Sequence, residues 1–270
     1  MSQINLLIFG DVVGKLGRKA LAKKLPELKA RYSPHLTIAN AENLAHGRGL
    51  TESTLNELVE AGVDAFTSGQ HVWENQQGAP LLSDEQWSKH LIRPGNVDPL
   101  LPGNSAMTFV VLGKPVTIAN LQGRLFMSQE SSSPFLSFDR IWQELSSDQA
   151  KPMVIIDFHA EATSEKQAFG HYVDGRASLV YGTHTHVPTA DAKILPQGTA
   201  YCTDIGMVGL TDSVIGFEKN SSIKRFLEET TAPYELLSSG QAEVNGLAIS
   251  LDIDSNRVLS LEQIREFVDI

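Results

Sequence analysis

The 270-residue chain contains a single cysteine, Cys202, which excludes an internal disulfide bond and a cysteine-rich zinc site. Basic residues are also scarce: 22 Lys and Arg stand against 32 Asp and Glu, and the formal net charge is −10. A protein this acidic lacks the positive surface by which proteins bind duplex nucleic acid or an anionic membrane. A local reversal of charge, such as a bound metal, would still allow a phosphate to bind.

Long hydrophobic runs are missing as well, and no stretch approaches the roughly 20 apolar residues of a membrane span. The apolar run Ile4–Phe9 is too short for a signal peptide, and no basic segment precedes it. We therefore expect a cytoplasmic protein with no membrane partner. Apolar residues make up 41% of the chain and charged residues 20%, which is typical of globular proteins with a buried core.

Short apolar runs rich in β-branched residues alternate with helical patterns along the chain. The runs have the length of buried strands and lie at Ile4–Phe9, Leu36–Asn40, Ala65–Ser68, Met153–Phe158 and Leu179–Tyr181. Helices are predicted at Arg18–Tyr32, from Thr54 to Gly62, at Pro134–Ser146 and at Ser164–Tyr172. We expect Pro26 to bend or divide the first helix, and Thr54 with Glu57 to form a capping box at the start of the second.

Two pairs of strand-like segments break the alternation and predict antiparallel hairpins. They are Ser105–Val111 with Pro115–Leu121, and Glu243–Ile253 with Val258–Phe267. Strands that alternate with helices favour a layered α/β fold. We therefore predict central β-sheets flanked by helices, with antiparallel hairpin additions. No repeat or linker divides the sequence, so residues 1–270 are expected to form a single domain.

Each predicted strand is followed by carboxylate, amide or imidazole side chains. Because sites in open α/β sheets form at the carboxyl ends of strands, we expect these groups to meet at one edge. His184 and His186 alternate on a segment that we expect to be extended, which would point both side chains the same way. The groups at the five strand ends are Asp11, Glu42, Asn43, Gln70, His71, His159, His184 and His186.

Carboxylates, amides and imidazoles together favour a site for hard or borderline divalent metals. Sites with two such ions are used for phosphoryl transfer and related hydrolysis. Two divalent ions would also outweigh the charges of the two carboxylates, so that an anionic phosphate could bind. Structural alternatives stay open: Gly10-Asp11 as a turn, His159 as a buried core histidine, and His184 with His186 as part of a solvated loop.

Blocks of the sequence resemble the ordered motifs of the calcineurin-like metallophosphoesterases. They are Gly10–Gly14, Asn40–Asn43, Gly69–His71, Asp157–Lys166 and Gly182–Asp191. The closer resemblance is to the YmdB-type bacterial branch, a family of 2′,3′-cyclic-nucleotide phosphodiesterases. The similarity extends from about Ile4 to the last predicted hairpin and so covers nearly the whole chain.

The resemblance implies a role for each residue at the strand ends. One metal would be held by Asp11, Glu42, Asn43 and His186. Glu42 would bridge to a second metal held by Gln70, His159 and His184, and His71 would be the general acid. Family members are associated with iron, and manganese often substitutes, whereas the residues alone indicate only two divalent ions with oxygen and nitrogen ligands.

One residue and one short segment depart from the family pattern. Gln70 stands where the family has Asn, and its extra methylene moves the amide oxygen, whereas metal–ligand distances tolerate only about ±0.2 Å. We therefore predict a weakened second metal site with reduced but retained catalysis. The segment Val72–Asn75 reads Val-Trp-Glu-Asn where the family commonly has Thr-Trp-Asp-Lys, which would alter the rim of the pocket.

The resemblance implies metal-dependent hydrolysis of phosphoric diesters. A hydroxide that bridges the two ions would attack phosphorus in line, and His71 would protonate the departing ribose oxygen. The substrate would be a cyclic nucleotide or another small phosphodiester. Two alternatives stay open: a non-catalytic or weakly catalytic regulatory protein, motivated by Gln70, and a metal-dependent phosphomonoesterase. A homo-oligomer is expected because symmetric assemblies are common.

Four further residues have no single assigned role. Arg93, Asn96 and Arg124 lie in segments that resemble family loops, where they would either contact phosphate or ribose or make structural hydrogen bonds. Asp157 precedes His159 by two residues and either supports the site or is structural. The substrate-binding residues therefore stay unknown.

Overall fold

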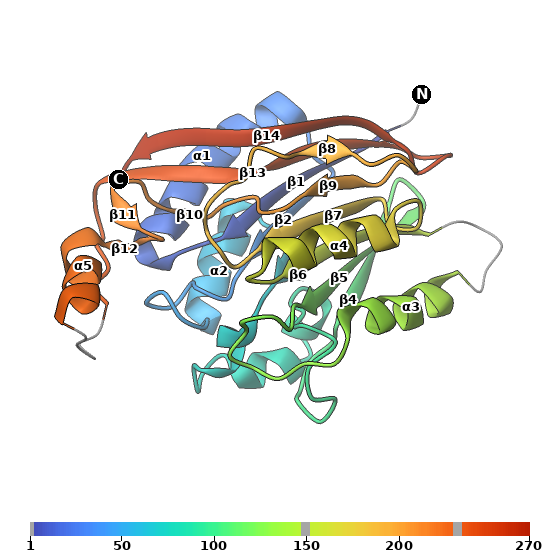
Figure 1. The fold of residues 1–270 in the computed structure, drawn as a ribbon. Helices are drawn as coiled ribbons and strands as arrows, with labels where there is room; N and C mark the ends of the chain where they lie inside the picture. The colour runs from blue at the N-terminus through green and yellow to red at the C-terminus, as the bar shows by residue number, and fades with distance from the viewer. Residues whose placement is uncertain (1–2, 147–151, 229–233) are drawn as a thin grey trace.

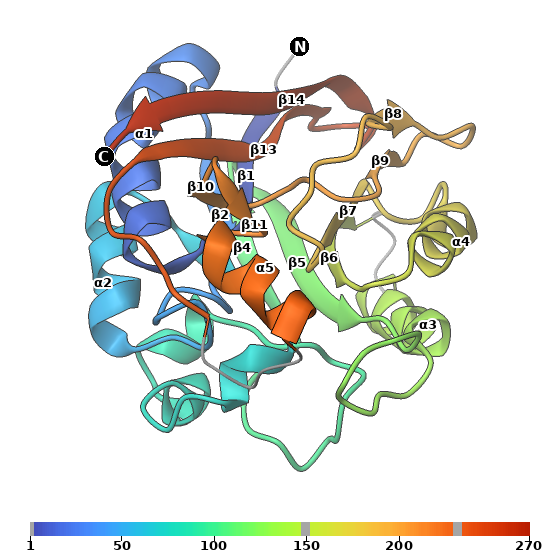
Figure 2. The same ribbon diagram turned by 60° about the vertical axis from the view of Figure 1, so that its left-hand side comes forward.

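The computed structural model describes residues 3–146, 152–228 and 234–270 and contains two large β-sheets packed face to face (Figures 1 and 2). In the first sheet the strand order is β10-β13-β1-β2-β3, and β14 pairs with β13. β1, β2 and β3 run parallel, so their carboxyl ends lie at the same edge. The strands are β1 (Gln3–Asp11), β2 (Leu36–Asn40), β3 (Ala65–Thr67), β10 (Val208–Leu210), β13 (Gln241–Asp252) and β14 (Val258–Asp269).

The second sheet has the order β4-β5-β6-β7-β9-β8, and its four central strands run parallel. Its strands are β4 (Ala106–Val111), β5 (Lys114–Gln122), β6 (Met153–His159), β7 (Leu179–Thr183), β8 (Lys193–Ile194) and β9 (Ala200–Cys202). A separate two-stranded sheet pairs β11 (Ser213–Val214) with β12 (Phe217–Glu218).

Helices cover the outer faces of both sheets and complete four layers (Figure 1). α1 (Gly14–Tyr32) and α2 (Glu52–Ala61) pack on the first sheet, and α3 (Pro134–Leu145) and α4 (Thr163–Val173) on the second. The chain also contains α5 (Lys219–Glu228) and the 3₁₀ helices η1 (Gln70–Trp73), η2 (Ala79–Ser83) and η3 (Trp87–Lys89).

The two sheets meet through a buried apolar layer. Ile8 and Ile38 of the first sheet face Ile118 and Ile155 of the second, and all four side chains are inaccessible to solvent. Full burial of such a side chain stabilises the fold by about 1.5–3 kcal/mol. This layer fixes the two sheets relative to each other, and therefore also fixes the residues that follow their strands.

The predicted α/β class, the five strands and both hairpins are confirmed. Pro26 lies inside α1 and does not divide it, and Leu21, Leu25 and Leu28 bury one continuous face across it. One local prediction is wrong. The capping box is formed by Thr51 as N-cap with Thr54 in the third helical position, not by Thr54 with Glu57.

The end of α2 lies where the sequence places it, at Gly62, whose φ of 105° is a left-handed conformation suited to glycine.

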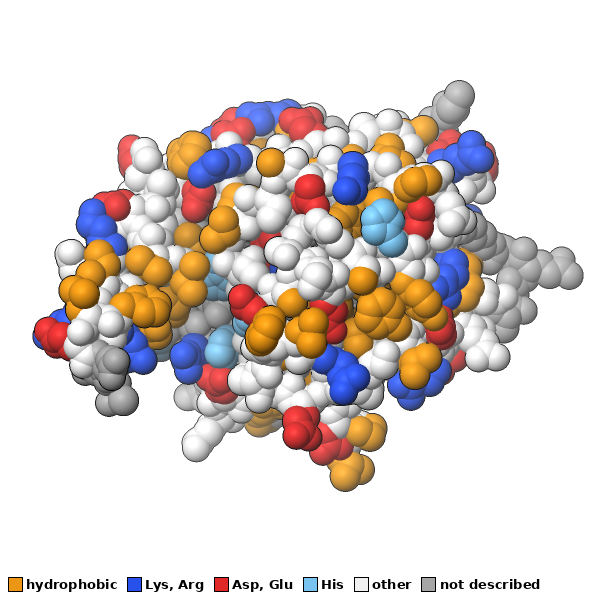
Figure 3. Space-filling model, viewed as in Figure 1, with side chains coloured by type: hydrophobic (Ala, Val, Ile, Leu, Met, Phe, Trp, Pro, Cys, Tyr) orange, Lys and Arg blue, Asp and Glu red, His pale blue; other side chains and the backbone are white. Residues whose placement is uncertain are grey.

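None of the helices within the described residues combines the length and apolar character needed to cross a membrane. On the face of the molecule shown in Figure 3, acidic and basic side chains are interspersed with apolar ones.

Candidate metal centre

Residues that follow five different strands converge where the carboxyl edges of the two sheets meet. Asp11 ends β1, His159 ends β6, and His184 comes directly after β7. Glu42 lies two residues beyond β2, and Gln70 begins η1 after β3. Parallel strand order therefore brings together groups that are far apart in the sequence: the His184 N–H donates to Oδ2 of Asp11, 173 positions away.

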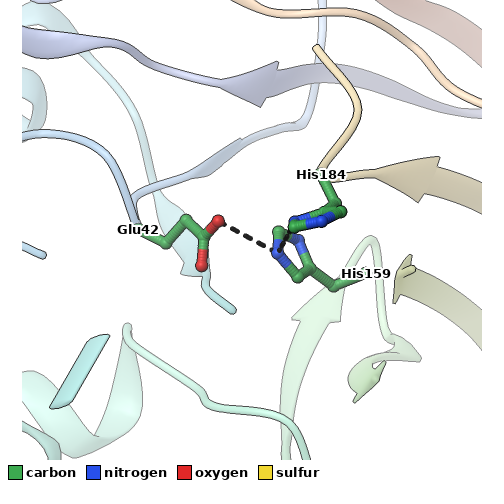
Figure 4. A group of neighbouring side chains, drawn as sticks. All are labelled: Glu42, His159 and His184. Carbon is green, nitrogen blue, oxygen red and sulfur yellow. Dashed lines mark hydrogen bonds and ion pairs between the residues drawn. The ribbon is translucent and has the colours of Figure 1, made fainter. Parts of the chain in front are cut away.

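Glu42, His159 and His184 form the tightest part of this cluster (Figure 4). Oε1 of Glu42 lies 3.0 Å from Nε2 of His159, and that nitrogen lies 3.2 Å from Nδ1 of His184. One ligand atom from each residue lies within 4.8 Å of the others. Their donor types fit a borderline divalent cation.

Asp11 and His186 extend the cluster on the other side of His159. Oδ1 of Asp11 lies 3.9 Å from Nε2 of His186 and 4.0 Å from Nδ1 of His159. Asp11 and His159 are inaccessible to solvent, and His186 is 5% exposed. Asn43 is also buried, and its side-chain N–H donates a hydrogen bond to the carbonyl of Gly47. The amide oxygen of Asn43 is therefore free to act as a further metal ligand.

Three buried oxygens from the predicted ligands have no hydrogen-bond partner: Oδ1 of Asp11, Oδ1 of Asn43 and Oε1 of Gln70. Buried polar atoms are nearly always paired, because an unpaired one loses its hydration without compensation. Bound cations would satisfy these oxygens. The residues present therefore fit the metals that the sequence predicted.

Two of the histidines use one ring nitrogen for a partner outside the cluster and keep the other nitrogen directed to the cluster. His186 Nδ1–H donates to the carbonyl of Ile215 at 2.8 Å, which leaves Nε2. His184 Nε2 lies 3.0 Å from Oε2 of Glu161, which leaves Nδ1. Such outer partners are typical of metal-binding histidines because they fix the tautomer and the ring orientation.

Burial and close charges shift the pKa values of these groups. Burial raises the pKa of Asp11. Burial would also raise the pKa of Glu42, but the nearby imidazoles, His159 first, outweigh it and lower the value to about 2. Burial lowers the pKa of His159, but Glu42 and Asp11 outweigh it and raise the value to about 9, whereas burial and His159 together lower the pKa of His184 to about 3.

Gln70 and His71 lie at the mouth of the cluster. The Gln70 amide nitrogen is 3.3 Å from Nδ1 of His184 and 3.4 Å from Nε2 of His71. The backbone N–H of His71 donates to Oε2 of Glu42, and its Nδ1 lies 2.7 Å from Oε1 of Glu74. Glu74, which belongs to the segment that departs from the family pattern, thus orients the ring of His71.

Other residues singled out in the sequence have structural contacts. Arg93 is buried and donates to the carbonyls of Pro94, Leu101 and Pro102. Asn96 is buried and bridges the carbonyls of Gln122 and Ser132. The structural interpretation therefore applies to these two residues.

Sequence reasoning missed the residues that support the ligands. Asn40 accepts a hydrogen bond from the N–H of Glu42, and its side chain donates to Asp157. Lys166 and Asp204 form a buried ion pair 2.6 Å long, and Asp204 also accepts from the hydroxyl of Thr185, between the two histidines. Asn40 and Lys166 lie within blocks that carried the resemblance, but no spacing rule pointed to Asp204.

Comparison with known proteins agrees with this geometry. The model of the family described as YmdB-like protein matches residues 7–264. The chain belongs to the YmdB-like family. It is 43% identical over 264 residues to the 2′,3′-cyclic-nucleotide 2′-phosphodiesterase of Bacillus subtilis (strain 168), covering 97% of this chain and 96% of that protein.

Two solved structures of similar length share the fold of this YmdB-like protein. A hypothetical protein from Thermus thermophilus has a TM-score of 0.88 at 38% identity, over 98% of this chain and 99% of the other. A phosphatase from Mycoplasma pneumoniae has a TM-score of 0.91 at 35% identity, over 100% and 95%. The predicted resemblance is confirmed, and so is the prediction of a phosphoester hydrolase at that level of detail.

Proposed function

We propose that this YmdB-like protein is a phosphodiesterase that uses two divalent metals to open 2′,3′-cyclic nucleotides to monoesters. The observation that carries the proposal is the convergence of buried carboxylates and imidazoles with three unpaired buried oxygens. The name of the Bacillus subtilis relative supports the substrate class. The arrangement of the site alone supports hydrolysis of phosphoesters in general and does not select the cyclic nucleotides among them. The fold does not select them either, because one fold can carry many functions.

The ligand sets are those that the family resemblance implies, and the unpaired oxygens of Asp11, Asn43 and Gln70 support them. Asp11, Glu42, Asn43 and His186 would hold one metal, and Glu42, Gln70, His159 and His184 the other. Iron or manganese fits these oxygen and nitrogen donors. When bound, two such ions supply positive charge that offsets a phosphate and lower the pKa of water to near neutrality.

The residues of the chain itself handle the substrate proton. In the proposed reaction, Nε2 of His71 carries a proton that passes to the departing ribose oxygen. Glu74 holds the other ring nitrogen at 2.7 Å and so keeps Nε2 directed away from it. The side chain of His71 is 19% exposed, so it can reach a bound substrate, whereas Glu42 and His159 are buried.

The deciding experiment is hydrolysis of 2′,3′-cyclic AMP by protein reconstituted anaerobically with iron or manganese, compared with metal-stripped protein. We expect metal-dependent turnover that is lost in Asp11→Asn. Turnover of a monoester but not of the cyclic diester would favour a phosphomonoesterase. The Mycoplasma pneumoniae structure, which is named a phosphatase, supports this alternative. No turnover by folded, metal-loaded protein would favour the regulatory alternative. The cytoplasmic location, the single domain and the homo-oligomer stay predictions.

A further inference from the structure

A chain of three buried side chains runs from the metal centre into the second sheet. Nδ1 of His159 lies 2.8 Å from the Thr183 hydroxyl, which lies 2.6 Å from Oδ1 of Asp157. None of the three side chains is exposed. His159 and Thr183 are paired residues of the neighbouring strands β6 and β7, and Asp157 lies on the same face of β6 as His159.

The direction of this hydrogen-bond chain is fixed at its Asp157 end. An ionised carboxylate only accepts hydrogen bonds, so the Thr183 hydroxyl gives its single proton to Asp157. The other carboxylate oxygen accepts from the Thr67 hydroxyl at 2.5 Å and from the Asn40 amide at 3.1 Å. The three side chains that contact the Asp157 carboxylate therefore all donate hydrogen bonds to it.

The Thr183 oxygen is then left to accept, and the group facing it is Nδ1 of His159. That nitrogen must carry a proton in order to donate. The other nitrogen, Nε2, faces Glu42 and His184 and is the atom available to a cation. A hydroxyl that pointed the opposite way would favour a proton on Nε2 and block it.

We propose that Asp157 and Thr183 are positioning residues that hold His159 as its Nδ1–H form and thereby present Nε2 to the metal. The proposal rests on the proposed function, because it assumes that His159 is a ligand. It assigns to Asp157 a role that its position in the sequence left open. Outer partners of this kind typically change metal affinity about 10–100-fold when they are removed.

Thr67 provides a matched control. Thr67 and Thr183 are both inaccessible, and both hydroxyls donate to the same carboxylate, but only Thr183 contacts His159. We expect Thr183→Val to weaken Mn²⁺ binding about 10–100-fold. We expect Thr67→Val to bind Mn²⁺ nearly as the wild type does, and Thr183→Ser to restore binding because the hydroxyl returns.

A second variant tests the direction of the hydrogen bonds between Asp157, Thr183 and His159. In Asp157→Asn, the amide NH₂ is expected to face Thr183, because the opposite side already receives two donors. Thr183 would then turn its proton toward His159, and Mn²⁺ affinity should fall about 10–100-fold as in Thr183→Val. The measurement is equilibrium dialysis of the stripped full-length chain against Mn²⁺, with free ion counted by electron paramagnetic resonance and folding checked by circular dichroism.

The outcomes separate the two proposals. Equal losses in Thr183→Val and Thr67→Val would overturn the role of the Thr183 link while the two-metal function stood, because the effect would then come from the buried carboxylate in general. A wild-type chain that binds no Mn²⁺ and no iron would overturn both. A selective loss in Thr183→Val and Asp157→Asn, with rescue in Thr183→Ser, would support the role of the link.

Discussion

A Cβ atom on Gly69 would lie only 2.3 Å from Nε2 of His159 and 2.1 Å from Oε2 of Glu42. The φ angle of Gly69 is −147°, which any residue can adopt, so space alone requires glycine here. The backbone between β3 and η1 therefore approaches the ligand atoms directly. This approach is what places the next two residues, Gln70 and His71, at the mouth of the centre.

We expect Gly69→Ala to lose metal binding while the protein stays folded. The added methyl group would displace Glu42 or His159, and loss of ligand geometry should weaken Mn²⁺ binding by at least about tenfold. Gly113→Ala is the opposite case: its φ is 78° and no atom lies within 4 Å, so stability should fall by about 1 kcal/mol with metal binding unchanged. Equilibrium dialysis and thermal unfolding check both; retained binding in Gly69→Ala would contradict the argument.

Gln70→Asn should strengthen the second metal site. The Gln70 amide lies 3.3 Å from Nδ1 of His184, but its oxygen has no partner, and the shorter side chain is the family form. We expect Mn²⁺ affinity to rise on the order of tenfold, or about 1.4 kcal/mol, with a parallel rise in turnover. Gln70→Ala should lower both. Unchanged affinity in Gln70→Asn would mean that the backbone already compensates for the longer side chain.

The sequence predicted the strands and the ends of the strands because buried strands have a period and a length that can be read locally. Asp11 and His159 are found at strand ends as expected. The short strands β8 to β12 and the helix α5 were missed, because two or three residues show no period and α5 buries little of its surface.

The loop of His184 and His186 shows the limit of local reasoning. An extended segment would point both side chains the same way, but φ is 92° at His184 and 65° at His186. The two rings diverge, one toward His159 and the other toward Asp11. The loop takes this shape because the buried pair of Lys166 and Asp204 holds it, and a pairing between residues 38 positions apart leaves no local signal.

That buried pair predicts a large effect on stability. Nζ of Lys166 also donates to the carbonyl of Thr183, so Lys166→Met would leave Asp204 buried without a cation. We expect the free energy of unfolding to fall by about 3–5 kcal/mol. Lys219→Met breaks an exposed pair with Asp212, which water and salt screen, and should leave the stability nearly unchanged. Urea unfolding of the metal-free proteins compares them, and similar losses in both variants would contradict the prediction.

Metal affinity should rise with pH. In the metal-free protein the pKa of His159 is raised to about 9, so the protonated imidazole is favoured at neutral pH. The charged ring stabilises the fold fully below pH 6.5, the ordinary pKa of histidine, and this stabilisation is lost as the pH rises through 9. A metal must displace that proton. Mn²⁺ affinity should therefore increase by about tenfold between pH 7 and 8 for each proton released. Dialysis at fixed ionic strength measures this, and a flat profile would contradict the protonated state.

The role of His71 can be tested by comparing substrates whose leaving groups differ in their need for a proton. A ribose alkoxide needs a proton as it departs, whereas a nitrophenolate leaves without one. We expect His71→Ala to slow hydrolysis of 2′,3′-cyclic AMP by about 10²–10⁴-fold and that of bis(p-nitrophenyl) phosphate far less. Because Glu74 orients the ring at 2.7 Å, Glu74→Gln should show the same selectivity at a smaller magnitude. Metal content, measured in each variant, must stay at the wild-type level. Equal slowing of both substrates would show that His71 acts through the metal site or substrate binding instead of as the acid.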